Sequence, residues 1–178
     1  PLSAQPDAVI GWGLKPTSRR ARRYADKRRL PYVALEDGFL RSLGLSSAGY
    51  QPHSLVVDYS GIYYDASRPS DLEQWLATAD FSSEEVSRAE HCIALLRRYR
   101  LSKYNHAPDK PLSASGASVL VVDQTAGDAS IDYGGASAAS FSAMLEHALA
   151  YHPQAKVLVK IHPDVIAGKK QGHLTSAL

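Results

Sequence analysis

The sequence has 178 residues, of which 44% are apolar, and its formal net charge is +2. This length accommodates one large domain or two small lobes with a core, and the small net charge excludes a polyelectrolyte. The single cysteine, Cys92, excludes intramolecular disulfides and thiolate metal clusters, and its helical surroundings predict a core residue.

Signals for membrane insertion and secretion are missing from the sequence. No apolar run approaches the roughly 18 residues of a membrane span, and the polar start over residues 1–7 lacks both a signal-peptide pattern and an initial Met. We therefore expect a cytoplasmic protein and a sequence that is a piece of a longer chain.

The first hundred residues predict an α/β lobe over 1–101. Its expected elements in chain order are strand 8–10, a helix capped by Thr17 or Ser18 and running to about Arg29, strand 30–35, a hairpin of strands 55–58 and 62–65, a helix over 71–77, and a longer helix capped by Ser82 or Ser83. The apolar side of the longer helix carries Val86, Ala89, Ile93 and Leu96 at helical spacing.

The first helix is unusually basic, with seven Lys or Arg residues between Arg19 and Arg29. The charges cover most of the circumference and leave Ala21, Tyr24 and Ala25 to pack against the lobe. A solvated helix face is the simplest interpretation. An anionic membrane surface is the better functional alternative, and a nucleic-acid backbone is the weaker one.

The composition changes after residue 101. Pro, Ser, Gly and Asn without a period predict a linker over 102–117. A second lobe begins at 118 with strands 119–122 and 157–161, joined by a helix over 140–150. Because a doubly wound lobe normally has about five or six strands, we expect residues 118–178 to be the incomplete beginning of that lobe.

Two motifs directly follow the strands of the second lobe. Ligands in open α/β sheets lie beyond the carboxyl ends of the strands, so the loop ending at Asp128 and the His162-Pro163 dipeptide are expected at one edge. Asp128 is either a nucleophile or base at a sugar carbon, or a helix N-cap. Pro163 fixes the backbone after His162, whose imidazole either donates to a phosphate or bonds locally.

Further charged side chains are candidates for ligand binding. Lys160, Lys169 and Lys170 suit an anionic ligand or are ordinary surface lysines. Glu36 and Asp37 with Arg41, at the end of strand 30–35, predict either a site for sugar hydroxyls or a tight turn. No set of His and carboxylate residues has the spacing of a metal site, so we expect no metal.

Several strings together resemble one family, the KpsC-type capsule polysaccharide β-Kdo transferases of Gram-negative bacteria. The strings are Gly11-Trp-Gly-Leu-Lys-Pro16, Ala34-Leu-Glu-Asp-Gly-Phe-Leu-Arg-Ser42, Gly61-Ile-Tyr-Tyr-Asp65, Leu101-Ser-Lys-Tyr-Asn105, Val121-Val-Asp-Gln-Thr125, Gly127-Asp-Ala-Ser130, Lys160-Ile-His-Pro-Asp164 and Gly168-Lys-Lys170. The resemblance implies GT-B-like Rossmann-type lobes, here an N-terminal acceptor-side lobe and the start of a donor lobe.

The resemblance also implies a chemistry. It implies a retaining transfer of Kdo from CMP-β-Kdo, without a further cofactor, through a carboxylate adduct. Asp128, in a Gln-x-x-x-Asp motif that begins at Gln124, is the implied nucleophile, and His162 is implied to hold the CMP phosphate. Glu36 or Asp37 is the expected base on the acceptor side.

The implied partners are the nucleotide sugar and a lipid-linked Kdo acceptor, and nucleic acid is not expected. Peripheral contact with the cytoplasmic face of the inner membrane and with capsule-export machinery is a further expectation. The alternative is a non-catalytic lobe that binds glycan or nucleotide in a capsule assembly. A stretch expected around the nucleotide has no match here, so these 178 residues alone are expected to transfer Kdo poorly or not at all.

Overall fold

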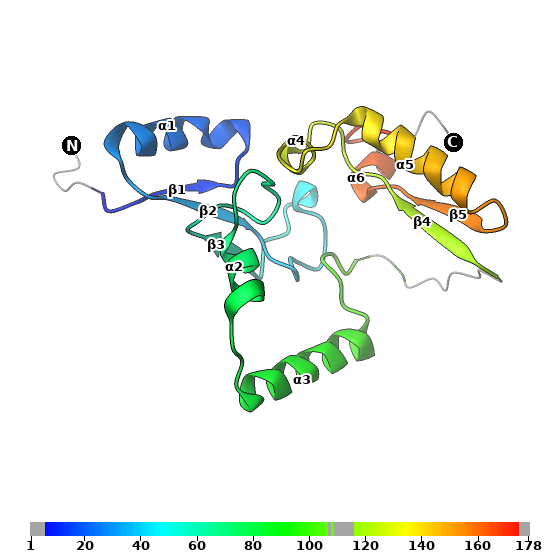
Figure 1. The fold of residues 1–178 in the computed structure, drawn as a ribbon, viewed down its shortest axis with the longest axis horizontal. Coiled ribbons are helices and arrows are strands. Elements are labelled where there is room, and N and C mark those ends of the chain that lie inside the picture. Colours follow the sequence, from blue (N-terminus) through cyan, green and yellow to red (C-terminus); the bar gives the residue numbers. More distant parts are fainter. Residues whose placement is uncertain (1–5, 107, 109–115, 175–178) are drawn as a thin grey trace. The chain divides into compact units, whose positions relative to one another are not determined.

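The computed structural model describes residues 6–106, 108 and 116–174, and its elements are labelled in Figure 1. The chain has a mixed α/β fold and divides into two compact units, residues 1–108 and 109–178. Each unit has its own sheet and is described by itself below.

The first unit is built on a three-stranded sheet in the order β1-β2-β3. Strand β1 (Val9–Trp12) pairs in parallel with β2 (Tyr32–Asp37), and β3 (Leu55–Asp58) pairs antiparallel with β2. Helix α1 (Arg19–Arg28) connects β1 to β2 and contacts both strands. The predicted strand–helix–strand unit is therefore confirmed. Two short 3-10 helices, η1 (Pro16–Ser18) and η2 (Ser46–Ala48), interrupt the loops.

The start of α1 differs in detail from the prediction. Ser18 occupies the N-cap position, but its hydroxyl donates to the carbonyls of Gly13 (3.1 Å) and Lys15 (2.8 Å) and does not cap the helix. Ala25 is buried as expected, whereas the Tyr24 side chain is 44% exposed. The prediction that Tyr24 packs against the lobe is thus wrong, because α1 turns Ala25 toward the sheet.

The predicted hairpin of strands 55–58 and 62–65 is also wrong. The carboxylate of Asp58 is buried at the end of β3, and its Oδ1 accepts hydrogen bonds from the backbone N–H groups of Ser60 (3.0 Å) and Gly61 (2.7 Å). It also accepts from the N–H of Asp71, whose own carboxylate accepts from Tyr59 N at 2.8 Å. This reciprocal pair turns the chain away from β3, and β3 pairs with β2 instead.

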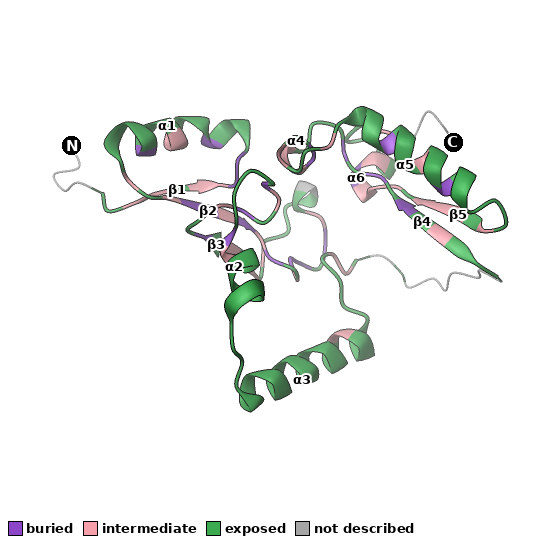
Figure 2. Cartoon of the chain, viewed as in Figure 1, coloured by how far each residue is buried: buried purple, intermediate pink, exposed green. Residues whose placement is uncertain are grey.

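Helices α2 (Asp71–Thr78) and α3 (Ser83–Tyr99) begin where the sequence predicts, because their caps are local. Ser70 accepts from Glu73 N, and Ser82 forms a capping box with Glu85. No residue of either helix is buried within the described part of the chain, and Figure 2 shows α3 exposed along nearly its whole length. Cys92 lies on α3 and is exposed, so its prediction as a core residue is wrong.

The predicted linker begins with residues that pair inside the first unit. The carbonyl of Lys103 accepts from Arg41 N at 3.1 Å, and Asn105 N donates to the Leu43 carbonyl at 2.8 Å. Tyr104 forms an isolated bridge with Ser42. Residues 107 and 109–115 of that linker lie outside the described residues.

The second unit has a two-stranded parallel sheet of β4 (Ser118–Val122) and β5 (Lys156–Lys160). The connection contains α4 (Ala129–Tyr133) and α5 (Ala138–Tyr151), and α6 (Pro163–Ile166) follows β5. Helix α5 covers one sheet face (Figure 1). The core on that face consists of Val121, Ile131, Phe141, Ala148 and Leu174, with Val119, Val157 and Val159 packed against it.

Replacing Asp58 by Ala is expected to lower the free energy of unfolding of the first unit by about 2–3 kcal/mol. The substitution leaves the N–H groups of Ser60, Gly61 and Asp71 without their charged acceptor. Both tryptophans, Trp12 and Trp75, lie in this unit, so urea denaturation followed by tryptophan fluorescence reports on it. Asp80→Ala, at an exposed position, is the control.

Asp71 is expected to make the same unit sensitive to acid. The Ser60 hydroxyl and the backbone N–H of Tyr59 donate to the Asp71 carboxylate and lower its pKa below the ordinary 3.8. A carboxyl whose pKa is lowered on folding adds stability above its unfolded pKa, and this stability is lost as the pH falls through the folded pKa. When the pH is lowered from about 5 to about 3, the melting temperature of Asp71→Asn should therefore fall less than that of the wild type. An identical loss in both proteins would contradict this role.

Candidate functional site

The candidate site of the second unit lies at the edge where β4 and β5 both end. The strands are parallel and in register, with Val122 opposite Lys160. The loop from Asp123 to Asp128 leaves β4 at this edge, and His162 with Pro163 leaves β5 there. The two motifs that the sequence places after separate strands are thus brought to one edge of one sheet, where ligands of α/β proteins bind.

A buried carboxylate, Asp123, holds this edge together. Its side chain is 3% exposed, and its two oxygens accept from the backbone N–H groups of Gln124 (2.9 Å), His173 (3.1 Å) and Leu174 (3.3 Å). A Cβ atom at Gly172 would lie 2.4 Å from Asp123 Oδ2, so the approach requires glycine. Asp123 is not among the site residues expected from sequence. The available signal was a carboxylate directly after an apolar strand.

Backbone pairing extends the same connection along the loop. Thr125 forms an antiparallel bridge with Gly172, and Ala126 N donates to the Gln171 carbonyl at 2.8 Å. The loop that carries Gln124 and Asp128 is therefore fixed against the segment that follows Lys170.

Asp128 is the N-cap of α4 and is exposed. Its Oδ1 accepts from Ser130 N at 3.0 Å and from the Ser130 hydroxyl at 2.9 Å. The same hydroxyl lies 3.3 Å from Oε1 of Gln124, so Ser130 holds both polar residues of the Gln-x-x-x-Asp motif. Capping and chemistry do not compete here, because the cap uses Oδ1 and leaves Oδ2 outside the described hydrogen bonds.

His162 caps the next short helix in a comparable way. Its Nδ1 accepts from Asp164 N at 3.1 Å, with Pro163 as the first residue of α6. An imidazole whose Nδ1 accepts carries its proton on Nε2 in the neutral form, so Nε2 is a hydrogen-bond donor. The sequence left open whether His162 bonds locally or to a phosphate, and the local hydrogen bond is present. This bond places the proton on Nε2, which suits an anionic ligand.

The three lysines lie on segments at or beyond this edge. The N–H groups of Lys169 (2.8 Å) and Lys170 (3.1 Å) both donate to the carbonyl of Asp164, and both lysines are exposed. Lys160 is the exposed last residue of β5. By strand alternation it shares the sheet face opposite the Phe141 core. The positive charge thus comes from the end of β5 and from the segment that follows α6.

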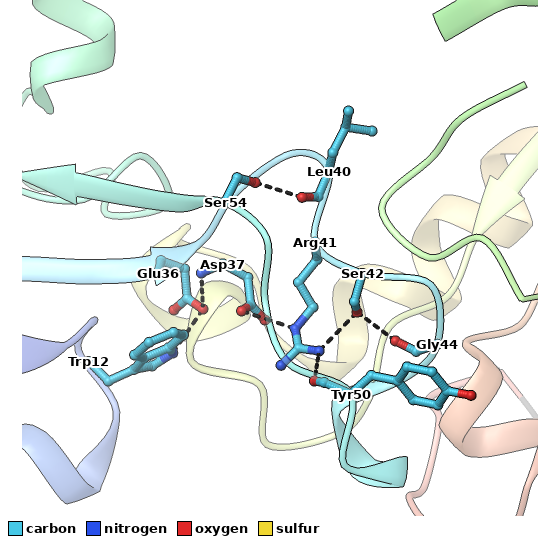
Figure 3. Close-up of polar contacts among 9 residues, drawn as sticks. All are labelled: Trp12, Glu36, Asp37, Leu40, Arg41, Ser42, Gly44, Tyr50 and Ser54. Carbon is cyan, nitrogen blue, oxygen red and sulfur yellow. Dashed lines mark hydrogen bonds and ion pairs between the residues drawn. The ribbon is translucent and has the colours of Figure 1, made fainter. Parts of the chain in front are cut away.

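The second group of expected site residues lies in the first unit, at the end of β2 (Figure 3). Glu36 is 9% exposed, and its Oε1 accepts from Trp12 Nε1 (3.0 Å) and from Asp37 N (3.1 Å). Asp37 forms an ion pair with the buried Arg41 at 3.1 Å. Arg41 Nη1 also donates to the Ser42 hydroxyl (2.9 Å) and to the Tyr50 carbonyl.

This network separates the roles of the two acidic residues. Asp37 is engaged by Arg41, which fixes the loop between β2 and β3 and makes Asp37 a structural group. Glu36 uses one oxygen for Trp12 and Asp37 N, while Oε2 faces Gly13, where a Cβ would lie 3.0 Å away. Each carboxylate of this pair thus keeps one oxygen outside the described hydrogen bonds, and the difference is that the charge of Asp37 is paired with Arg41 whereas Glu36 accepts from neutral donors.

The expected site residues fall into two groups on different units. The second unit carries Gln124, Asp128, Lys160, His162, Pro163, Lys169 and Lys170, and the first unit carries Glu36, Asp37 and Arg41. Among the described residues, no group of three or more His, Cys, Asp or Glu side chains is arranged to hold a metal ion. In the same part of the chain, no helix has both the length and the apolar character needed to cross a bilayer.

Comparisons with known proteins match the chain to one family. The family model for capsule polysaccharide biosynthesis proteins matches residues 7–115 and 109–178. The capsule polysaccharide modification protein LipA of Neisseria meningitidis serogroup B is 52% identical over 176 residues, covering 95% of this chain and 25% of LipA. The lipopolysaccharide-processing protein LpsZ of Rhizobium meliloti is 38% identical over 172 residues, covering 93% of this chain and 39% of LpsZ.

Two solved structures are similar to the chain. KpsC β-Kdo 2,4 transferase from Thermosulfurimonas dismutans has a TM-score of 0.88 and 45% identity, covering 94% of this chain and 53% of that one. KpsC β-Kdo 2,7 transferase from the same organism has a TM-score of 0.63 and 30% identity, covering 93% and 49%. The chain spans about half of each solved structure and a smaller share of the curated relatives.

Removing the Asp123 carboxylate is expected to detach the backbone of His173 and Leu174 from the loop after β4. In Asp123→Ala, the amides of His173 and Leu174 lose their acceptor, and their hydrogen exchange should accelerate by at least about tenfold. Hydrogen exchange followed by NMR or mass spectrometry measures this. Asp132→Ala, at an exposed position of α4, should leave both amides protected. Equal protection in Asp123→Ala and the wild type would contradict the role of Asp123.

Proposed function

The chain belongs to the capsule polysaccharide biosynthesis protein family, and we propose that it forms part of a retaining β-Kdo transferase module. The donor is CMP-β-Kdo, and the two units are parts of the Rossmann-type lobes of a GT-B-like fold. The observation that carries the proposal is the position of Gln124, Asp128 and His162 at one edge of the β4–β5 sheet. The likeness to about half of KpsC β-Kdo 2,4 transferase supports it.

The charge of the edge suits the proposed donor. CMP-β-Kdo carries a phosphodiester and a sugar carboxylate, and both are anionic. Lys169 and Lys170 supply positive charge, and His162 supplies an N–H donor for a phosphate oxygen. Charge-assisted hydrogen bonds of this kind are roughly twice as strong as neutral ones. His162 thus stabilises the negative charge that develops as CMP departs.

Asp128 is the proposed nucleophile. Its Oδ2 forms a bond to the anomeric carbon while the bond from that carbon to the CMP phosphate oxygen breaks. The acceptor hydroxyl then displaces Asp128, and two inversions retain the β configuration. Kdo has no hydroxyl next to its anomeric carbon, which eases the build-up of positive charge there. Ser130 holds Oδ1 at 2.9 Å, so the carboxylate is oriented before the donor binds.

Glu36 is the proposed base on the acceptor side. Its Oε1 is held by Trp12, and Oε2 is outside the described hydrogen bonds, so the group is both oriented and available. Asp37 is the weaker candidate because the Arg41 guanidinium occupies it.

The β-Kdo 2,4 linkage is proposed over the 2,7 linkage, since the likeness to the 2,4 transferase is greater in both identity and TM-score.

The test is a Kdo adduct on Asp128 in the full natural protein. Intact mass spectrometry after incubation with CMP-β-Kdo should show the mass of one Kdo, and peptide mapping should place it on Asp128. Asp128→Asn should abolish the adduct and lower the transfer rate by at least about a thousandfold. Asn is as good an N-cap as Asp, so the fold of α4 should be unaffected.

Two further variants separate catalysis from binding. His162→Ala should weaken binding of CMP-β-Kdo in calorimetry, whereas Asp128→Asn should bind the donor nearly as well as the wild type. Asp132→Asn changes an exposed carboxylate on the same helix and should leave both properties unchanged. Wild-type transfer by Asp128→Asn, or an adduct on another residue, would refute the assignment and favour a non-catalytic lobe that binds the nucleotide sugar.

A further inference from the structure

The outer face of α1 is a continuous strip of positive charge. Arg19, Arg20, Arg23 and Lys27 are exposed, whereas Ala25 on the opposite side is buried against the sheet. At helical spacing these four side chains lie next to one another, and the acidic residue of the helix, Asp26, is exposed at the border of this strip. They are called the basic face of α1 below.

The residues of the basic face are not used to hold the fold. None of the four forms an ion pair with a residue in the part of the chain that the structure describes. Arg22, on the inner side of the same helix, behaves differently, because its Nη2 donates to the Leu14 carbonyl at 3.1 Å. The structural arginine of α1 is thus distinct from its four outer cations.

The charge pattern also works against the helix. Arg19, Arg23 and Lys27 follow one another at i,i+4, where like charges repel. Arg19 and Arg20 lie in the first turn, where the helix dipole disfavours cations, and this turn contains no acidic residue. By contrast, α3 has Glu84 and Glu85 in its first turn, while both helices have basic residues in their last turn. The cations in the first turn of α1 and their i,i+4 spacing therefore require an explanation other than helix stability.

We infer that the basic face of α1 docks onto an anionic lipid bilayer. A bilayer with anionic headgroups presents a diffuse negative potential that matches a flat strip of cations. Tyr24 borders the basic face with its side chain 44% exposed, and the Arg28 guanidinium lies 5.7 Å from its ring centroid. A half-exposed tyrosine beside cations is typical of a residue at the membrane interface.

Nucleic acid is the competing partner, and the basic face suits it less well. Its Arg and Lys residues would also bind phosphates of a nucleic acid, but the half-exposed Tyr24 at its border is a side chain enriched at the bilayer interface. The inference goes beyond the proposed transferase activity. It is independent of Asp128, which lies in the other unit.

Vesicle sedimentation tests the inference. The wild-type chain should sediment with vesicles of phosphatidylcholine containing about 30% phosphatidylglycerol and not with phosphatidylcholine alone. Each basic residue near an anionic surface contributes about fivefold to the partition coefficient. The quadruple variant Arg19→Gln, Arg20→Gln, Arg23→Gln, Lys27→Gln should therefore bind several hundredfold less. Binding of the wild type should also weaken as salt shortens the screening length.

A matched control removes the same charge elsewhere. Arg88→Gln, Arg97→Gln, Arg98→Gln and Lys156→Gln together also remove four exposed cations and change the net charge from +2 to −2. This control should keep most of the vesicle binding. Circular dichroism checks the fold of both variants, and the double variant Arg20→Gln, Arg23→Gln, expected to bind about 25-fold less, replaces the quadruple variant if that one unfolds.

Three results would overturn the inference. The first is a wild-type chain that does not sediment with anionic vesicles, and the second is an equal loss of binding in the quadruple variant and its matched control. The third is tighter binding of the wild type to a labelled DNA duplex or single-stranded RNA than to the vesicles at the same salt, which would assign the basic face to nucleic acid.

Discussion

The hydrogen bonds from backbone N–H groups to the buried Asp123 carboxylate are the constraint on which the candidate site depends. They join the loop after β4 to the segment at His173 and Leu174, and so fix the surroundings of Gln124 and Asp128. Asp58 fulfils the same role after β3 in the first unit. Neither carboxylate forms an ion pair with a described residue. Backbone donors stabilise both charges without a buried cation, and each carboxylate thereby sets the path of the chain.

The polar residues of the candidate sites combine a structural role with the chemistry proposed for them. Asp128 and His162 both cap short helices, and each uses one atom, Oδ1 or Nδ1, for the cap. The cap restricts the rotamers of the side chain, which lowers the entropy that must be lost when a ligand binds. Glu36 follows the same pattern through its bond to Trp12. Local capping and ligand chemistry are thus compatible uses of one side chain.

The sequence-based expectations that were wrong share a physical cause. The packing of Tyr24 and the burial of Cys92 concern which surface a residue faces, and the hairpin after β3 concerns which segment pairs with that strand, so all three depend on contacts with distant parts of the chain. Periodicity identifies an apolar side of a helix or strand, but it does not identify what lies against that side. The start of α2 at residue 71 and the cap of α3, expected at Ser82 or Ser83 and found at Ser82, were predicted correctly because both depend on residues three positions apart.

The sequence by itself determined β1, α1 and β2 in their order, the starts of α2 and α3, and the placement of the two motifs after β4 and β5, because local propensity and apolar runs are read along the chain. The tertiary structure alone decided which side-chain atoms form hydrogen bonds with distant parts of the chain. Trp12 reaches Glu36 across 24 positions, and Asp123 reaches His173 across 50. Contacts between such distant positions follow from strand pairing and packing, which no local pattern encodes.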